Sequence, residues 1–112
     1  MRLEQISLPG EVLLVKLTGA LDIAGAGEIE TPLHALSAKH SKVIVDLAGV
    51  TFLASVGIRV LLKAARAIRA NKGVLALFAP TDEAQRVLRS TGIDTIIPVV
   101  ADQATAIAEC NK

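Results

Sequence analysis

Apolar residues recur along the chain in short runs, and their spacing predicts an alternation of strands and helices. Ile6 and the run from Val12 to Leu17 indicate two short strands, because the Pro9-Gly10 pair between them favours a turn. The nearly continuous apolar character of the second run is typical of a strand covered on both faces. We therefore expect two successive strands at the start of a sheet.

Residues 22–39 have a helical pattern, with apolar positions at spacings of four and three. These positions are Ile29, Leu33 and Leu36. Pro32 lies inside the stretch and leaves two interpretations open. Either the helix kinks at this proline, or Thr31 caps a helix whose first residue is Pro32.

A β-branched run from Val43 to Leu47 predicts a short buried strand that ends at Ala48-Gly49. Residues 56–71 have the clearest helical pattern, with an apolar stripe on one side and cations on the other. The apolar stripe consists of Ile58, Leu61, Leu62, Ala65 and Ile68. The cations are Arg59, Lys63, Arg66 and Arg69. Asn71-Lys72-Gly73 then predicts the C-terminal end of this helix.

The last third of the chain predicts two further strand and helix pairs. Val74 to Phe78 is a strand, and Thr81 caps a helix that extends to Arg89. Thr95 to Val99 is a short strand, and Asp102 to Glu109 is the last helix. The order ββαβαβαβα predicts an α/β fold, a mixed β-sheet with helices packed against it through right-handed crossovers.

Composition supports one globular domain over residues 1–112 and excludes several functions. The hydrophobic fraction is 52%, and the formal net charge is only +1, so a whole-surface nucleic-acid binder is not expected. The aromatic fraction of 2% disfavours sites that stack bases or sugars. One cysteine, no signal-peptide pattern and no apolar run of membrane length predict a cytoplasmic protein.

Catalytic and metal-binding motifs are absent from the sequence. There is no glycine-rich phosphate loop followed by Lys-Ser/Thr, no HExxH and no CxxC. We assign His34 and His40 to surface or capping roles, and Cys110 to the fraying C-terminal tail. No nucleophile and base are paired by local spacing, so we expect neither an enzyme nor a metal or cofactor site.

Ser55 is the most informative candidate, because it lies between a strand and the start of the basic helix. One interpretation is a helix N-cap, in which the hydroxyl accepts a free amide hydrogen of the next turn. The other is a phosphate position, because the N–H groups and the dipole of a helix start favour a phosphoryl group. The two interpretations are compatible, since the hydroxyl can cap the helix until it is modified.

Four stretches of the sequence together resemble the STAS domain, the module of bacterial anti-sigma factor antagonists and of sulfate-transporter tails. Leu17 to Asp22 is similar to the family's L-x-G-x-L-D, and Val43 to Gly49 to its strand ending in D-L-x-x-V. Phe52 to Leu61 resembles the F-x-D-S-S/T-G-L-x-x-L phosphorylation motif. Val87 to Ile97 resembles L-x-x-x-G-L-x-x-I. The resemblance covers roughly residues 5 to 109 and implies a STAS-type fold.

The resemblance implies an anti-sigma factor antagonist that works by partner switching. Its partner would be an anti-sigma factor with ATP-dependent serine kinase activity, which would release the protein after phosphorylating it and so regulate sigma-factor-dependent transcription. The phosphorylated serine of the motif falls on Ser55, and its final glycine on Gly57. The motif's aspartate is Ala54 here, and its second hydroxyl residue is Val56. No cofactor is implied, because ATP belongs to the kinase.

The charge pattern adds a candidate docking surface for that partner. Residues 47–81 contain five bases and no acid, so a basic helix face adjoins an uncharged loop. Such a face is either simply solvated or a rim that attracts an acidic partner. Asp22 is expected to cap the first helix, and the family resemblance implies that its turn lies beside this loop. Asp46 is expected to accept local backbone hydrogen bonds. The expected partner-binding residues are Asp22, Phe52, Leu53, Ala54, Ser55, Val56, Gly57, Arg59 and Lys63.

Two other functions remain open from the sequence. The first is a non-switching STAS subunit of a lipid-transport or signalling complex, which the replacements at Ala54 and Val56 favour. The second is a small nucleotide-binding or enzymatic α/β domain, which the missing phosphate loop disfavours.

Overall fold

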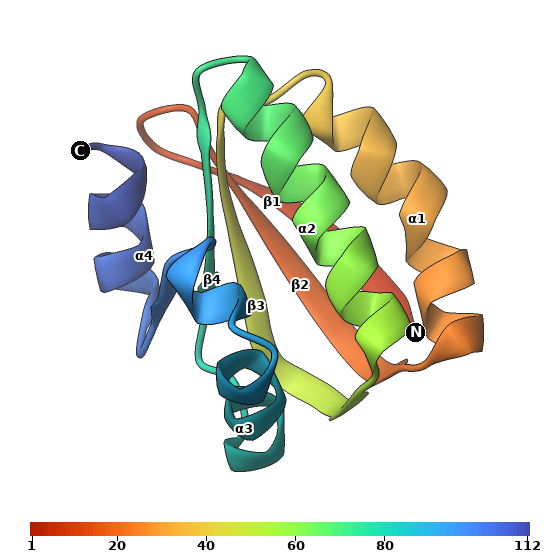
Figure 1. Ribbon diagram of the computed structural model, residues 1–112. Helices are drawn as coiled ribbons and strands as arrows, with labels where there is room; N and C mark the ends of the chain where they lie inside the picture. The colour runs from red at the N-terminus through yellow and green to blue at the C-terminus, as the bar shows by residue number, and fades with distance from the viewer.

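The computed structural model describes all residues from Met1 to Lys112 and has a five-stranded mixed sheet (Figure 1). The strands are β1 (Arg2–Leu8), β2 (Val12–Leu21), β3 (Lys42–Leu53), β4 (Val74–Phe78) and β5 (Val99–Val100). The helices are α1 (Ile23–Ser37), α2 (Ser55–Ala70), α3 (Asp82–Ser90), the 3₁₀ turn η1 (Ile93–Thr95) and α4 (Gln103–Cys110). The strands lie in sequence order; β1 is antiparallel to β2, and every other pairing is parallel. The predicted fold class and element order are confirmed.

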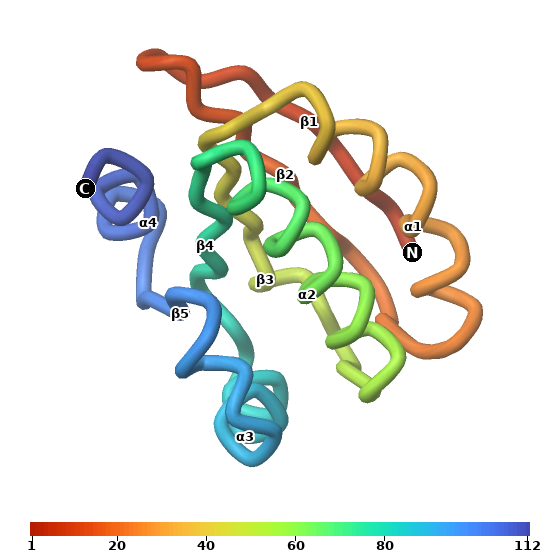
Figure 2. Tube along the Cα trace, turned by 45° about the horizontal axis from the view of Figure 1, so that its top comes forward, coloured from red at the N-terminus to blue at the C-terminus, as the bar shows by residue number.

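Helices cover both faces of the sheet but unequally, as the two views of the chain show (Figures 1 and 2). Helices α1 and α2 lie side by side on one face, over the larger apolar core. Leu17, Leu33 and Leu61 are fully buried there. Helix α4 packs against β3 and β4 on the opposite face, over a smaller core that includes Ile44 and Phe78.

Helix α1 decides between the two interpretations of Pro32. It begins at Ile23 and continues through Pro32 to Ser37, so the alternative in which Thr31 caps a new helix is wrong. The helix begins early because Asp22 caps it, its carboxylate accepting the N–H of Gly25 at 2.8 Å. At this interior position the proline removes one helical N–H and its ring crowds the preceding turn, so the helix continues at a cost in stability.

Strand β3 extends beyond its predicted end. Ala48-Gly49 does not stop it, because pairing with β2 continues to Leu53, with register shifts along β2 between Lys16 and Thr18 and between Gly19 and Ala20. A Cβ at Gly49 would lie 3.1 Å from the carbonyl oxygen of Leu17, so a glycine suits this irregular, close pairing. The extra length brings the ends of β2 and β3 to one edge of the sheet.

The predicted strand from Thr95 to Val99 is also wrong in its bounds. Its start belongs to the η1 turn, and only Val99–Val100 pairs with β4. Pro98 has no N–H to donate, although its carbonyl oxygen accepts the N–H of Leu77 at 2.8 Å. The strand is therefore limited to the two residues after the proline.

The C-terminal helix is better packed than the sequence suggested. Cys110 is buried at 6% exposure, with Sγ 3.8 Å from the carbonyl oxygens of Val43 and Val74, so its assignment to a fraying tail is wrong. Its side chain faces the sheet because α4 lies over β3 and β4. The cap predicted at Thr81 is confirmed. Asp102, predicted as the first residue of the last helix, is instead its N-cap, and its carboxylate accepts the N–H of Thr105. No helix combines the length and the apolar character needed to cross a bilayer.

Candidate functional site

The ends of β2 and β3 join to form the platform on which α1 and α2 begin. Leu21 pairs with Leu53, and the N–H of Ala54 donates to the carbonyl oxygen of Leu21 at 3.0 Å. Helix α1 follows β2 after Asp22, and helix α2 follows β3 after Ala54. This connection places Asp22 and the start of α2 at the same edge of the sheet.

Ser55 is the first residue of α2 rather than its cap, which corrects the capping interpretation. Ala54 occupies the N-cap position and offers no side-chain acceptor. The first intrahelical bonds are those from the N–H groups of Gly57 and Ile58 to the carbonyl oxygen of Ala54, at 3.0 and 3.1 Å. The N–H groups of Ser55 and Val56 precede these bonds and lie at the positive end of the helix.

The Ser55 side chain is exposed, and its hydroxyl makes no hydrogen bond within the chain. The other three α-helices begin after a side chain that accepts a backbone N–H. These caps are Asp22, Thr81 and Asp102. Helix α2 therefore presents a free hydroxyl at an uncapped N-terminus.

Two glycines allow both helices to start directly on the strand ends. A Cβ at Gly57 would lie 2.4 Å from Cγ and 2.9 Å from the carbonyl oxygen of Leu21. A Cβ at Gly25 would lie 2.0 Å from the carbonyl oxygen of Ala20. Any larger residue would push its helix away from the sheet. The close contact between Gly57 and Leu21 fixes the position of Ser55.

The apolar side chains at this edge differ in how far they reach solvent. Phe52 is 52% exposed, whereas Leu53 is buried at 4% and Val56 is half-buried against the core. Ile23, the first residue of α1, is 81% exposed and was missed by sequence reasoning. The exposure of Ile23 could have been predicted from its position, because it lies one residue away from the helical spacing that the buried residues of α1 follow. Phe52 and Ile23 are therefore the large apolar side chains that solvent reaches here.

Some of the charged side chains around Ser55 already have partners within the chain, and others do not. Arg59 is exposed and has no carboxylate within ion-pair distance. Lys63 has Nζ 4.0 Å from Oε2 of Glu30, which α1 supplies although the basic segment itself contains no acid. The carboxylate of Asp22 is used to cap α1. Arg59 is thus the unpaired cation one helical turn from Ser55, and no three His, Cys, Asp or Glu side chains gather as a metal site.

Comparison with known proteins identifies the family to which this chain belongs. The STAS domain matches residues 5–106. The chain belongs to the STAS domain family. A relative from Bordetella bronchiseptica, named "Putative anti-sigma factor antagonist BtrV", is 30% identical over 98 residues, which cover 87% of this chain and 84% of the relative.

Solved structures share the fold of this STAS domain at lower identity. The anti-sigma factor antagonist SpoIIAA in its unphosphorylated form has a TM-score of 0.80 at 19% identity, covering 98% of this chain and 96% of that one. The phosphorylated form of SpoIIAA, from Bacillus, has a TM-score of 0.73 at 19% identity, covering 96% and 98%. A sulfate transporter family protein from Wolinella succinogenes has a TM-score of 0.78 at 16% identity, covering 93% and 88%.

The motifs that carried the STAS resemblance occupy connected parts of the fold. Leu17 to Asp22 forms the end of β2, and Phe52 to Leu61 passes from β3 into α2, so these two meet at the Ser55 edge. Val43 to Gly49 lies within β3, where Asp46 accepts the N–H of Ala48 at 2.9 Å as expected. Val87 to Ile97 runs from α3 through η1. Among the expected partner-binding residues, Lys63 lies farthest along α2, about 12 Å of helix rise beyond Ser55.

Proposed function

We propose that this STAS domain is an anti-sigma factor antagonist that binds an anti-sigma factor with ATP-dependent serine kinase activity. Unmodified, it binds that kinase and so frees the sigma factor; phosphorylated on Ser55, it is released. The observation that carries the proposal is the exposed, unbonded Ser55 hydroxyl on an uncapped helix start, at the position of the family's phosphorylated serine. Family membership and the name of the Bordetella relative support it.

The start of α2 suits a phosphoserine chemically. A phosphate on Ser55 would lie beside the N–H groups of Ser55 and Val56, at the end of the helix where the dipole stabilises negative charge. Arg59 lies four residues further along the same helix face, within reach of a charge-assisted bond to that phosphate. The monomer therefore accommodates the modified serine without unfolding.

Release follows from where the new charge appears. The proposed docking surface has Phe52 and Ile23 as exposed apolar contacts, with Ser55 on the same edge and Arg59 at the rim. Phosphorylation adds about two negative charges to this edge, which the bound partner must desolvate or repel. The chain itself binds no cofactor and performs no catalytic step in this mechanism, which would operate in the cytoplasm with the kinase supplying ATP.

Phosphorylation by the cognate kinase tests the proposal directly. We expect a single phosphate on Ser55, located by mass spectrometry after incubation with kinase and ATP. Ser55→Ala should abolish the modification, whereas Ser90→Ala, which removes another exposed serine, should leave it unchanged. Phosphate on Ser41 or Ser90, or no phosphate at all, would reject the assignment.

Ala54 permits a second test, because it replaces the motif's aspartate at the N-cap. Ala54→Asp places a carboxylate beside the Ser55 hydroxyl and should raise the rate of phosphorylation. Ala54→Asn, which caps the helix without adding charge, is the matched control. An unchanged or lower rate with Asp would mean that the kinase of this chain recognises the loop in another way.

Binding kinetics separate the rim from the centre of the docking surface. Arg59→Glu plus Lys63→Glu should slow association and reduce its salt dependence, and Arg59→Glu alone should account for most of this because Lys63 faces Glu30. Ser55→Asp should instead speed dissociation by about 5- to 150-fold, or roughly 1–3 kcal/mol. Surface plasmon resonance at two salt concentrations measures both, with Arg89→Glu on α3 as control. An unchanged association rate would make the basic face a solvated one.

A non-switching subunit of a lipid-transport or signalling complex is the second candidate. The replacement of two motif residues by Ala54 and Val56 favours it, because a scaffold needs neither a kinase-oriented carboxylate nor a second hydroxyl. Affinity capture with the purified chain distinguishes the two candidates. A histidine-kinase-like ATPase among the captured proteins supports partner switching, and a transporter ATPase supports the scaffold.

A further inference from the structure

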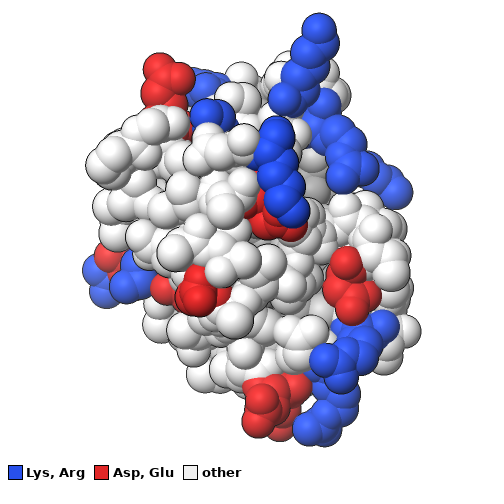
Figure 3. All heavy atoms as spheres, turned by 90° about the vertical axis from the view of Figure 1, so that its left-hand side faces the viewer, with Lys and Arg blue, Asp and Glu red and all other residues white.

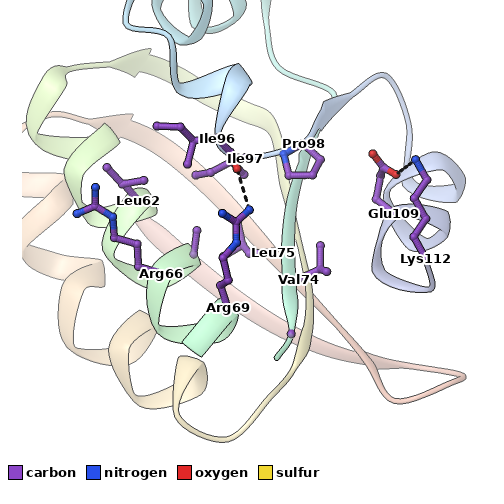
Figure 4. A pocket seen from close by; sticks show the side chains of 12 residues that line it. Leu62, Arg66, Arg69, Val74, Leu75, Ile96, Ile97, Pro98, Glu109 and Lys112 are labelled. Carbon is purple, nitrogen blue, oxygen red and sulfur yellow. Dashed lines mark hydrogen bonds and ion pairs between the residues drawn. The ribbon is translucent and has the colours of Figure 1, made fainter. Parts of the chain in front are cut away.

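A cavity of about 260 Å³ opens at the C-terminal half of α2, far from Ser55 (Figure 4). Its walls come from α2, β4, the loop between η1 and β5, and the end of α4. Leu62, Leu75 and Ile97 give it apolar walls. Arg69 lies fourteen residues after Ser55, about 21 Å of helix rise away, so the cavity is separate from the proposed partner surface.

The charged side chains at the cavity leave it positive. Arg69 Nη2 donates to the carbonyl oxygen of Ile96 at 3.2 Å, which holds the guanidinium across the cavity (Figure 4). Neither Arg66 nor Arg69 has a carboxylate within ion-pair distance. Glu109, the acid among the lining residues, is paired with Lys112. The two guanidinium groups are therefore uncompensated.

The surrounding surface has no continuous acidic patch that would neutralise these guanidinium groups. On the face that carries α3 and α4, basic side chains lie mainly near the top and bottom, and separate acidic side chains are scattered among them on an otherwise uncharged surface (Figure 3). An anion at the cavity would thus meet localised guanidinium groups beside apolar surface. Guanidinium groups bind planar carboxylates through paired N–H donors, and Arg69 uses only one of its donors on Ile96.

We propose that this cavity binds a small organic anion with an apolar body and a carboxylate head. The apolar body would contact Leu62, Leu75 and Ile97, and the carboxylate would bind Arg69. Arg66, whose guanidinium extends toward Leu62 and away from Arg69 (Figure 4), would add positive charge at the cavity. Ligand sites are typically apolar clefts or cavities of about 300–1,000 Å³, with a few polar groups that fix the orientation of the ligand. The volume here fits a short aliphatic acid and is small for a nucleotide.

Titration of the full-length protein with sodium octanoate tests the proposal, with amide chemical shifts as the readout. We expect saturable shifts in residues 62–75 and 96–98 and none at Ser55. Octan-1-ol, which lacks the charge, and inorganic phosphate, which lacks the apolar body, should each bind more weakly. Arg69→Gln should weaken octanoate binding about tenfold, as expected for the loss of one charge-assisted contact, and Arg66→Gln should weaken it by a smaller factor through the loss of positive charge.

Arg89→Gln, on an exposed face of α3 outside the cavity, is the matched control and should bind octanoate as the parent does. Because Arg69 also bonds to Ile96, Arg66→Gln keeps the test valid if the Arg69 variant loses stability. Equal affinity for octanol, equal affinity for phosphate, shifts that do not saturate, or unchanged binding in both cavity variants would each overturn the proposal. None of these results depends on whether Ser55 is phosphorylated.

Discussion

Substituting alanine for two glycines measures how tightly the start of α2 is held against β2. Gly57 and Gly27 both lie inside helices, so alanine should improve the helix propensity at both. Their surroundings differ: a Cβ at Gly27 has no neighbour within 4 Å, whereas a Cβ at Gly57 would overlap Leu21. Gly27→Ala is therefore a matched control that carries the propensity change without the contact.

The expected magnitudes follow from these surroundings. Gly27→Ala should raise the free energy of unfolding by about 1 kcal/mol. Gly57→Ala gains at most a similar amount, but overpacking costs about 1–3 kcal/mol, because the carbonyl oxygen of Leu21 cannot move as its side chain can. The two variants should thus differ by about 1–3 kcal/mol. With an unfolding entropy of about 2.1 cal/mol/K per residue, each kcal/mol shifts the Tm of this chain by about 4 °C.

Urea and thermal unfolding of the three proteins measure the difference, and the Ser55 amide shift reports whether the helix start has moved. Under the proposed function, Gly57→Ala should also slow phosphorylation of Ser55, because it displaces the hydroxyl, whereas Gly27→Ala should not. An increase in Tm of equal size in both variants would refute the reasoning, since it would mean that α2 does not press against the end of β2.

Three further predictions concern single positions. Pro32→Ala should raise the free energy of unfolding by about 1–2 kcal/mol, because it restores a helical N–H and relieves the clash with the preceding turn; urea unfolding measures this. Asp22→Ala should lower the Tm by the equivalent of about 1 kcal/mol through loss of the α1 cap, while Asp22→Asn should retain most of it. Burial raises the pKa of the Cys110 thiol above its usual value of 9.0. The free energy of unfolding should therefore be unaffected below that pH and should decline as the pH rises above it, because only the unfolded thiol then ionises. Unfolding free energies measured across that range should show this decline in the parent and a flatter dependence in Cys110→Ala.

Local patterns in the sequence predicted most elements, because each depended on neighbouring residues. Thr81 caps its helix as expected, and the strand from Val74 to Phe78 has the predicted bounds. The errors arose where distant segments decide the outcome. Residues after Ala48 remain in β3 because β2 pairs with them, and Cys110 is buried because α4 packs on β3 and β4.

The same distinction applies to the candidate site: neighbouring residues predict some of its features, and distant segments decide the others. Sequence could place Ser55 at a helix start, since a strand, a short segment and an amphipathic helix follow one another there. It could not separate the buried Leu53 from the exposed Phe52, because the direction of each side chain depends on the register of β3 with β2. It also could not bring Glu30 of α1 to Lys63, a contact made only when the two helices pack.

Because α2 has no side-chain cap, the proposed phosphorylation of Ser55 should change the stability of the protein by a measurable amount. Ala54 leaves the first N–H groups of α2 without a side-chain acceptor, and a phosphate on Ser55, under the proposed function, would provide oxygens and negative charge at that point. Phosphorylation should therefore raise the free energy of unfolding, by about 0.5–1 kcal/mol given the usual size of charge effects at an exposed helix N-terminus. In Ala54→Asp the carboxylate already occupies this position and repels the phosphate, so the gain should vanish or reverse. Unfolding curves of both proteins, each with and without phosphate, test this, and an identical gain in the two would show that the phosphate does not interact with the start of α2.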